Sequence, residues 1–357
     1  MNRDKLAKMI GKSKLSLVDA MEKIDLNGSG ILFIIDDNSE LCGCISDGDI
    51  RRWLIKTGNL NVYISEMLNS NPFYLYEDEK AKARDVLEEK PITAVPIIDI
   101  NNHIVDIVFR GIERSSIESE NLLKDTSVVI MAGGKGTRLY PYTKILPKPL
   151  IPIGDTPIVE RIMDSFAKFG VTDFYMSVNY KKEMIKSYFA DSSANRSIKY
   201  IEELEPLGTV GSLSLVKEKF EKPLFVTNCD VLINTDYSKA YLCHIESQND
   251  ITIVTALKNV VVPYGVIKFG IDGEVSQMEE KPKLSYFVNT GMYIINPNMM
   301  SLIPQDTFFH MTQLVEKIIA VGGKVGVFPI SEDSFLDMGE FDEMKRMEEK
   351  LNIISDR

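Results

Sequence analysis

The stretch Val129-Ile-Met-Ala-Gly-Gly-Lys-Gly-Thr-Arg-Leu-Tyr-Pro-Tyr-Thr-Lys-Ile-Leu-Pro-Lys-Pro-Leu-Ile-Pro-Ile153 determines the fold that we predict for the larger, C-terminal part of the chain. It begins with a short apolar run, continues with a glycine cluster that contains a Lys and an Arg, and ends with a Lys between two prolines. Glycines let backbone N–H groups approach an anion closely, and cationic side chains supply the opposite charge. The stretch therefore predicts a site for phosphate groups directly after a buried strand.

Strand-like and helix-like segments alternate from Thr126 onward. We expect strands at Val128–Met131, Phe174–Val178, Ile198–Glu202 and Leu224–Asn228, and helices at Pro157–Phe169, Lys182–Phe189 and Thr209–Phe220. Asp155 or Thr156 is expected to cap the first of these helices, and Gly170 to end it. This order predicts an α/β fold with a mainly parallel sheet and helices on both faces. Ligands lie at the carboxyl ends of such strands, so the loop after Met131 is where we expect one.

Two common phosphate-binding loops do not fit the glycine cluster. Gly136 is followed by Thr-Arg, so the Lys-Ser/Thr end of a Walker A loop is missing. A dinucleotide fingerprint would need a third glycine where Leu139 stands.

The whole stretch resembles the signature of the sugar-1-phosphate nucleotidyltransferases, G-G-x-G-T-R-L-x-P-x-T-x-x-x-P-K-P-L. Residues 133–150 match every fixed position of it. Further segments resemble this family in the same order: Pro206–Gly211, Asn228–Asp230, Tyr264–Gly265, Glu279–Pro282, Val288–Tyr293 and Phe335–Gly339. The resemblance covers about residues 126–345. It implies a Rossmann-like (GT-A-type), mixed, mainly parallel sheet in a catalytic domain over residues 121–357. It also implies the reaction of an NTP with a sugar 1-phosphate to give an NDP-sugar and pyrophosphate.

The same resemblance implies roles for individual residues. It makes Arg138, Lys148, Asp230 and Lys281 catalytic, and it places the nucleotide on Ala132, Gly133, Gly134, Gly136, Thr137, Gly208 and Asp230. It places the sugar phosphate on Gly265, Glu280, Lys281 and Asn289, and Mg²⁺ on Asp230 and Asp337. Glu202 and Glu203 have two open interpretations, a contact with the base or a solvated strand end.

Residues 1–120 contain an internal repeat. Residues 34–46 and 97–109 can be laid over one another, each as strand, polar turn and strand, with Asp36 on Asp99. A helix-like segment precedes each copy, at Ser16–Ile24 and Lys80–Glu88. The repeat predicts one supersecondary unit used twice. The polar segment Glu113–Lys124 is expected to be the linker to the second domain.

This N-terminal part resembles the tandem CBS (Bateman) module. In that family a Ser/Thr and an Asp three residues later hold a nucleotide, and Ser46 and Asp49 match that spacing. The resemblance implies a regulatory module with an adenine nucleotide as its ligand. The other interpretation is that Ser46 and Asp49 only cap the helix that follows them. Phe109 and Ile112 stand at the corresponding positions of the second copy.

The composition excludes several kinds of partner. The formal net charge is -11, so binding to nucleic acid is not expected. The N-terminus carries no apolar signal segment, and no apolar run reaches the roughly 18 residues that span a bilayer. Four cysteines without metal-ligand spacing predict free thiols in a reducing compartment. We therefore predict a cytoplasmic protein.

The most specific prediction is a guanylyltransferase. The Pro-Leu-Gly-Thr-Val-Gly segment resembles relatives that use guanine nucleotides, so GTP is favoured. The pairing of a CBS module with this domain resembles the glucosamine-1-phosphate guanylyltransferases of bacterial legionaminic acid pathways. Uridylyl or thymidylyl transfer to another hexose 1-phosphate and a non-catalytic nucleotide sensor are the alternatives. CBS pairs often associate in twos, which predicts a homo-oligomer.

Overall fold

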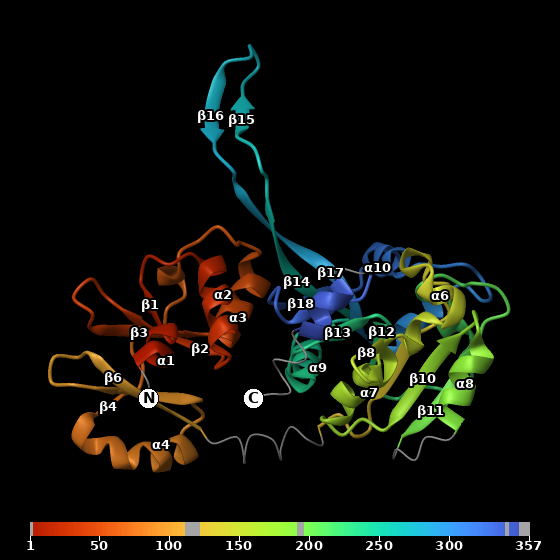
Figure 1. Ribbon diagram of the computed structural model, residues 1–357, viewed down its shortest axis with the longest axis horizontal. Coiled ribbons are helices and arrows are strands. Elements are labelled where there is room, and N and C mark those ends of the chain that lie inside the picture. Colours follow the sequence, from red (N-terminus) through yellow and green to blue (C-terminus); the bar gives the residue numbers. More distant parts are fainter. Residues whose placement is uncertain (1–2, 111–121, 191–195, 340–342, 350–357) are drawn as a thin grey trace. The chain divides into compact units, whose positions relative to one another are not determined.

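The computed structural model describes residues 3–110, 122–190, 196–339 and 343–349 (Figure 1). The chain forms two compact units, which are described separately because their positions relative to one another are not determined. The first unit comprises Met1–Arg114, Leu257–Val288 and Ser331–Asp333, and the second comprises Ser115–Ala256, Asn289–Ile330 and Ser334–Arg357. Most of the predicted linker Glu113–Lys124 lies outside the described residues.

The first unit contains the predicted duplication. In each half, a parallel strand pair is followed by an antiparallel pair with a β-bulge near one end. The two polar turns are bonded alike: Asp36 Oδ1 accepts the N–H groups of Asn38 and Glu40 at 2.9 Å, and Asp99 Oδ1 accepts those of Asn101 and His103 at 2.8 Å. The repeat in the sequence is therefore a repeat in the structure. The two sheets are β1 (Ile10–Lys12), β2 (Ile31–Ile35) and β3 (Leu41–Ser46), and β4 (Leu75–Tyr76), β5 (Ala94–Ile98) and β6 (Ile104–Phe109).

The helices of the first unit begin close to where the sequence predicts. Ser16 caps one of them by accepting the N–H of Asp19 at 3.1 Å. A capping box joins Ser46 and Asp49 at the start of another. The helices are α1 (Arg3–Lys8), α2 (Leu17–Asn27), α3 (Asp47–Thr57) and α4 (Ala83–Glu89), with 3-10 turns η1 (Ile64–Glu66) and η2 (Glu77–Lys82). The two-stranded hairpin of β15 (Val266–Phe269) and β16 (Val275–Glu279) also belongs to this unit.

The main sheet of the second unit has seven strands in the order β11-β10-β7-β12-β17-β14-β18. The first four strands are mutually parallel, and β17 runs antiparallel to β12. The prediction of a mixed, mainly parallel sheet is confirmed for this unit. The strands are β11 (Ser197–Glu202), β10 (Asp173–Val178), β7 (Ser127–Met131), β12 (Leu224–Asn228), β17 (Lys283–Ile295), β14 (Ile251–Val261) and β18 (Val325–Ile330).

The remaining elements of the second unit cover or connect this sheet. Helix α7 buries one apolar face, and Phe166 of that face stacks on Tyr237 with ring centroids 4.2 Å apart. The helices are α6 (Tyr142–Ile145), α7 (Ile158–Ala167), α8 (Lys182–Ala190), α9 (Tyr237–Glu246) and α10 (Met311–Ala320). The short strands are β8 (Pro152–Ile153), β9 (Thr156–Pro157), β13 (Val231–Ile233) and β19 (Phe335–Asp337), and the 3-10 turns are η3 (Thr137–Leu139), η4 (Lys148–Leu150), η5 (Gly211–Leu215) and η6 (Pro297–Leu302).

Two local predictions are wrong. A helix over Thr209–Phe220 does not form; only η5 is helical there. The N–H groups of Val210 and Gly211 donate to the Phe309 carbonyl, a distant loop, instead of to a carbonyl one turn earlier. The expected cap of α7 is also absent. Thr156 lies in β9, where it pairs with Ile153 of β8, and Pro157 occupies the cap position without a side-chain hydrogen bond.

Candidate active site

The glycine loop leaves β7 at the carboxyl end of the parallel strands. Ala132 anchors its start by donating its N–H to the Ser177 carbonyl of β10 at 3.0 Å. Gly136 has φ +62, and a Cβ there would lie 2.9 Å from Thr143 Cγ2, so both conformation and space require glycine. Gly134 is open, with no neighbouring atom within 4 Å of an added Cβ. The open backbone at Gly134, next to the tightly packed Gly136, leaves room for an anion to approach the N–H groups of the loop.

Arg138 and Asp337 meet at Gly339. Arg138 lies in η3, directly after the glycines. A Cβ added to Gly339 would lie 3.2 Å from both a guanidinium nitrogen of Arg138 and Oδ2 of Asp337. Gly339 thus lets two opposite charges from distant parts of the sequence approach one another.

Lys148 and Asp230 form a buried ion pair, and each residue is only 8% exposed. Lys148 begins η4, where the preceding Pro147 holds an extended conformation, and Asp230 comes two residues after the end of β12. Removing one partner of such a pair leaves an uncompensated buried charge. The pair therefore binds the proline-braced segment to the strand edge.

Asp230 and Asp337 are brought together by the pairing of β13 with β19. Val231 lies opposite Asp337 in this ladder, and Met338 donates its N–H to the Asp230 carbonyl at 2.8 Å. Burial raises the pKa of Asp337, and the negative charge of Asp230 raises it further. Two adjacent carboxylates that repel one another fit a divalent cation that also takes phosphate oxygens. Within the described residues no group of three or more His, Cys, Asp or Glu side chains could hold a metal.

The Pro-Leu-Gly segment is interlocked with a second loop. Gly208 has φ +82, and a Cβ there would lie 2.6 Å from the Phe309 carbonyl oxygen. Glu203 lies at its start and is 5% exposed, so the interpretation of a solvated strand end is wrong for this residue. Its carboxylate accepts the Ser177 hydroxyl and the Leu207 N–H, and a Cβ on Gly133 would touch it at 2.9 Å. Glu202 instead pairs with Lys182 and Lys186 at the surface.

The predicted sugar-phosphate residues are divided between the units. Asn289 is in the second unit, where its side chain donates to Tyr293 and accepts the N–H of Gly291. Gly265, Glu280 and Lys281 are in the first unit, at the base of the β15–β16 hairpin. A Cβ on Gly265 would lie 2.9 Å from the Glu280 carboxylate, and Lys281 has φ +47. Gly265, Glu280 and Lys281 are thus close to one another in the first unit. The glycine loop, Arg138 and Lys148 are brought together in the second unit and are called the phosphate cradle below.

One known protein family matches the part of the chain that contains these residues. The family model described as Nucleotidyl transferase matches residues 127–352. The chain belongs to this nucleotidyl transferase family. A D-glycero-alpha-D-manno-heptose 1-phosphate guanylyltransferase from Campylobacter jejuni is 33% identical over 215 residues, which cover 59% of this chain and 93% of the relative.

Other relatives match over shorter lengths. A mannose-1-phosphate guanyltransferase from Debaryomyces hansenii is 36% identical over 186 residues, 49% of this chain. The chain spans about half the length of such relatives, 51% in that case. A crystal structure of a putative glucose-1-phosphate thymidylyltransferase from Bacillus anthracis is similar with a TM-score of 0.50 and 20% identity, covering 63% of this chain and 94% of that one. At that identity the likeness shows the fold alone.

The sequence did not indicate the turn Asn179–Lys181, which the structure places against the glycine loop. Tyr180 donates its N–H to the Gly133 carbonyl at 3.4 Å. The signal was available, because the turn follows β10, the parallel neighbour of β7, and carboxyl ends of adjacent parallel strands share one edge.

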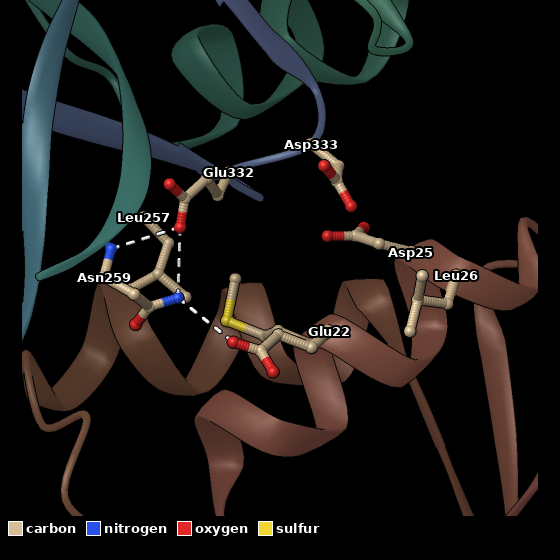
Figure 2. Close-up of a pocket in the computed structure, with 8 residues that line it drawn as sticks. Glu22, Asp25, Leu26, Leu257, Asn259, Glu332 and Asp333 are labelled. Atoms are coloured by element: carbon tan, nitrogen blue, oxygen red, sulfur yellow. Dashed lines mark hydrogen bonds between the residues drawn. The ribbon is translucent and has the colours of Figure 1, made fainter. Parts of the chain in front are cut away.

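A pocket of about 250 Å³ in the first unit has a different character (Figure 2). Figure 2 shows Asn259 bonded to Glu22 and Glu332, with Asp25 and Asp333 facing one another nearby. The four carboxylates of Glu22, Asp25, Glu332 and Asp333 disfavour a phosphate-bearing ligand here. None of the predicted site residues lines this pocket.

Proposed function

We propose that this chain transfers a nucleotidyl group from an NTP to a sugar 1-phosphate. The observation that carries the proposal is the gathering of Arg138, the Lys148–Asp230 pair and Asp337 around an open glycine loop at the strand ends. Positive side chains and the backbone N–H groups of the glycine loop suit a triphosphate, and the family assignment agrees with that chemistry.

The proposed reaction needs positioning more than acid–base chemistry. An oxygen of the sugar phosphate forms a bond to the α-phosphorus in line, while the bond from that phosphorus to the leaving pyrophosphate breaks. No general base is needed, because the attacking phosphate is already ionised. Arg138 stabilises charge that develops on the leaving group, and Lys148 meets the nucleotide phosphates. Mg²⁺ held by Asp230 and Asp337 would neutralise phosphate charge.

We propose GTP as the nucleotide and glucosamine 1-phosphate, or a related hexose or heptose 1-phosphate, as the acceptor. The names of the relatives that match, a heptose 1-phosphate guanylyltransferase and mannose-1-phosphate guanyltransferases, support a guanine base and a sugar 1-phosphate. The Glu203 carboxylate lies between the glycine loop and the Pro-Leu-Gly segment and can only accept hydrogen bonds when ionised. Both oxygens of this buried carboxylate already accept hydrogen bonds, from the Ser177 hydroxyl and the Leu207 N–H, so Glu203 holds the Pro-Leu-Gly segment beside the glycine loop.

The test is a matrix of pyrophosphate release, with GTP, ATP, CTP, UTP and dTTP each against hexose, hexosamine and heptose 1-phosphates. We expect release with GTP that depends on the sugar 1-phosphate and on Mg²⁺. Release with UTP or dTTP alone would favour the alternative base. If GTP binds but no combination releases pyrophosphate, the chain is a nucleotide sensor and the proposal is wrong.

We further propose that the N-terminal repeat is a CBS module that regulates the enzyme by binding an adenine nucleotide. The duplicated fold supports this. However, Asp49 already accepts the N–H and hydroxyl of Ser46 and pairs with Arg52, so a ligand must displace these bonds. Millimolar AMP should raise the Tm of the full chain, and no shift would leave Ser46 and Asp49 as helix caps. A homo-oligomer and a cytoplasmic location stay predictions; the described helices include none that could cross a membrane.

A further inference from the structure

Three consecutive residues between β10 and α8 each bond to a different part of the nucleotide site. Asn179 Nδ2 donates to the Glu203 carbonyl at 2.8 Å, where the segment leading to Pro206 begins. The Tyr180 hydroxyl donates to the Thr143 carbonyl at 3.1 Å. Lys181 Nζ donates to the carbonyls of Lys144 and Ile145 at 2.9 and 3.0 Å. One short turn thus joins the segment that leads to Pro206, which we expect beside the base, to residues 143–145, which lie between Arg138 and Lys148.

Lys181 makes these bonds from an unfavourable backbone conformation. Its φ is +53, a left-handed value that residues other than glycine rarely adopt. Such a conformation persists where the surroundings hold it in place, and it is found preferentially at functional sites. Here the ammonium group satisfies two carbonyls at the end of α6, a helix of only four residues that has few bonds of its own.

The bonded segment lies between the two key cations of the site. Thr143 donates its hydroxyl to the Gly136 carbonyl at 2.8 Å, two residues before Arg138. Ile145 is three residues before Lys148. A shift of α6 would therefore move both ends of the phosphate cradle.

We propose that Asn179–Lys181 is a positioning turn that holds the phosphate cradle in its binding-competent conformation, with Lys181 as its principal residue. This inference rests on the proposed nucleotidyl transfer. Lys181 acts through α6 and does not itself touch the substrate. Loosening the turn lowers the fraction of molecules whose cradle is formed, and apparent affinity falls by that fraction.

The test compares Lys181→Gly with Lys182→Ala in the full chain. Glycine accepts the positive φ without strain, so Lys181→Gly removes the two carbonyl bonds while keeping the backbone path. The neighbouring Lys182 points to Glu202 instead and is the matched control. We expect Lys181→Gly to raise KM for GTP by about 5- to 20-fold with kcat within about 3-fold, and Lys182→Ala to leave both unchanged. Lys181→Arg should restore part of the lost affinity.

Amide hydrogen exchange of residues 137–148 provides a readout that does not depend on activity. We expect faster exchange in Lys181→Gly, with Tm close to that of the unaltered protein. Unchanged exchange, or a rise in KM that Lys182→Ala shares, would overturn the inference. A third outcome is faster exchange in Lys181→Gly while the unaltered protein releases no pyrophosphate. That outcome would refute the proposed function and would still show that the turn holds the loop in place.

Discussion

Single residues carry the proposed chemistry, and the glycines among them contribute because they have no side chain. Gly136, Gly208 and Gly339 each leave room for a neighbour that a Cβ would displace. Arg138 and the Lys148–Asp230 pair supply the charges. Arg138 is exposed and touches substrate only in the proposed complex, so its effects on activity and on stability should separate. Loss of one partner of the buried Lys148–Asp230 pair should lower both.

Arg138→Ala should lower turnover by about 10²–10³-fold, the cost of removing one donor aimed at charge that develops in the transition state. Arg138 is exposed in the free protein, so Tm should change little. Initial rates of pyrophosphate release measure the effect. Arg84→Ala, an exposed arginine on α4, is the control. Near-normal turnover of Arg138→Ala would contradict the assigned role.

Gly208→Ala should destabilise the fold, because its positive φ and the 2.6 Å approach to the Phe309 carbonyl both exclude a Cβ. We expect the free energy of unfolding to fall by about 2 kcal/mol or more. Gly134→Ala, where a Cβ meets open space, should change it by less than about 0.5 kcal/mol. Urea denaturation of the two variants tests this contrast, which equal losses would refute.

Cys229 should be unreactive although it directly precedes Asp230. The thiol is 7% exposed, and burial raises its pKa to about 12, so almost no thiolate exists at neutral pH. The predicted free thiols are confirmed for all four cysteines. Alkylation by iodoacetamide at pH 8, mapped by mass spectrometry, should leave Cys229 unmodified until the chain is unfolded. Rapid labelling of Cys229 in the folded protein would show that the strand end is open.

At the scale of secondary-structure elements, the sequence predicts the strands and helices whose positions follow from local periodicity. The strands around the sheet centre and the helices α7 and α8 fall within a few residues of the expected positions. The segment Thr209–Phe220 was misjudged because its backbone bonds to Phe309, about a hundred residues away, and no local pattern reports such a partner. The turn Asn179–Lys181 was missed for a different reason, because its place after β10, at the sheet edge that it shares with the glycine loop, was not considered. The cradle was predictable because its signature is contiguous.

The end of α9 carries a buried polar cluster with a pH dependence of its own. His244 is 1% exposed, and its ring contacts Thr252 at 2.8 Å and Asn296 at 3.3 Å. Burial lowers its pKa below the usual 6.5. The unfolded chain therefore binds more protons than the folded one once the pH falls below about 6.5, and stability decreases in that direction.

His244→Gln should remove this contribution. The fall in Tm between pH 7.5 and pH 5.5 should be smaller in the variant than in the unaltered protein, even if the variant is less stable at pH 7.5. Differential scanning calorimetry at several pH values provides the comparison, and parallel curves for the variant and the unaltered protein would contradict the expected titration.

At the scale of the whole molecule, the first unit is assembled from distant parts of the sequence. Leu257 is 1% exposed and packs in the same cluster as Leu17 and Leu32, and Lys283 pairs with Glu22 at 2.5 Å. Gly265, Glu280 and Lys281 belong to this unit as well. The N-terminal repeat therefore has a structural connection to the residues that we expect to meet the sugar phosphate.

A fragment that begins at Leu122 should keep every residue of the cradle but lose the packing of Leu257. We expect it to bind GTP and to show a raised KM for the sugar 1-phosphate. Glu22→Gln in the full chain removes the charge that pairs with Lys283 and keeps an acceptor for Asn259, so it should have a far smaller effect. Steady-state kinetics with each substrate varied in turn measures both. An unchanged KM in the fragment would show that residues 1–121 do not affect binding of the sugar 1-phosphate.

The central claim is transfer at the α-phosphorus, and the fate of labelled phosphate tests it most directly. The full chain is incubated with Mg²⁺, the sugar 1-phosphate and GTP labelled in either the α- or the γ-phosphate. We predict that α-label appears in the nucleotide sugar and γ-label appears only in pyrophosphate. Label from the γ-position in orthophosphate or on the sugar would instead show hydrolysis or phosphoryl transfer, and would contradict the proposed function.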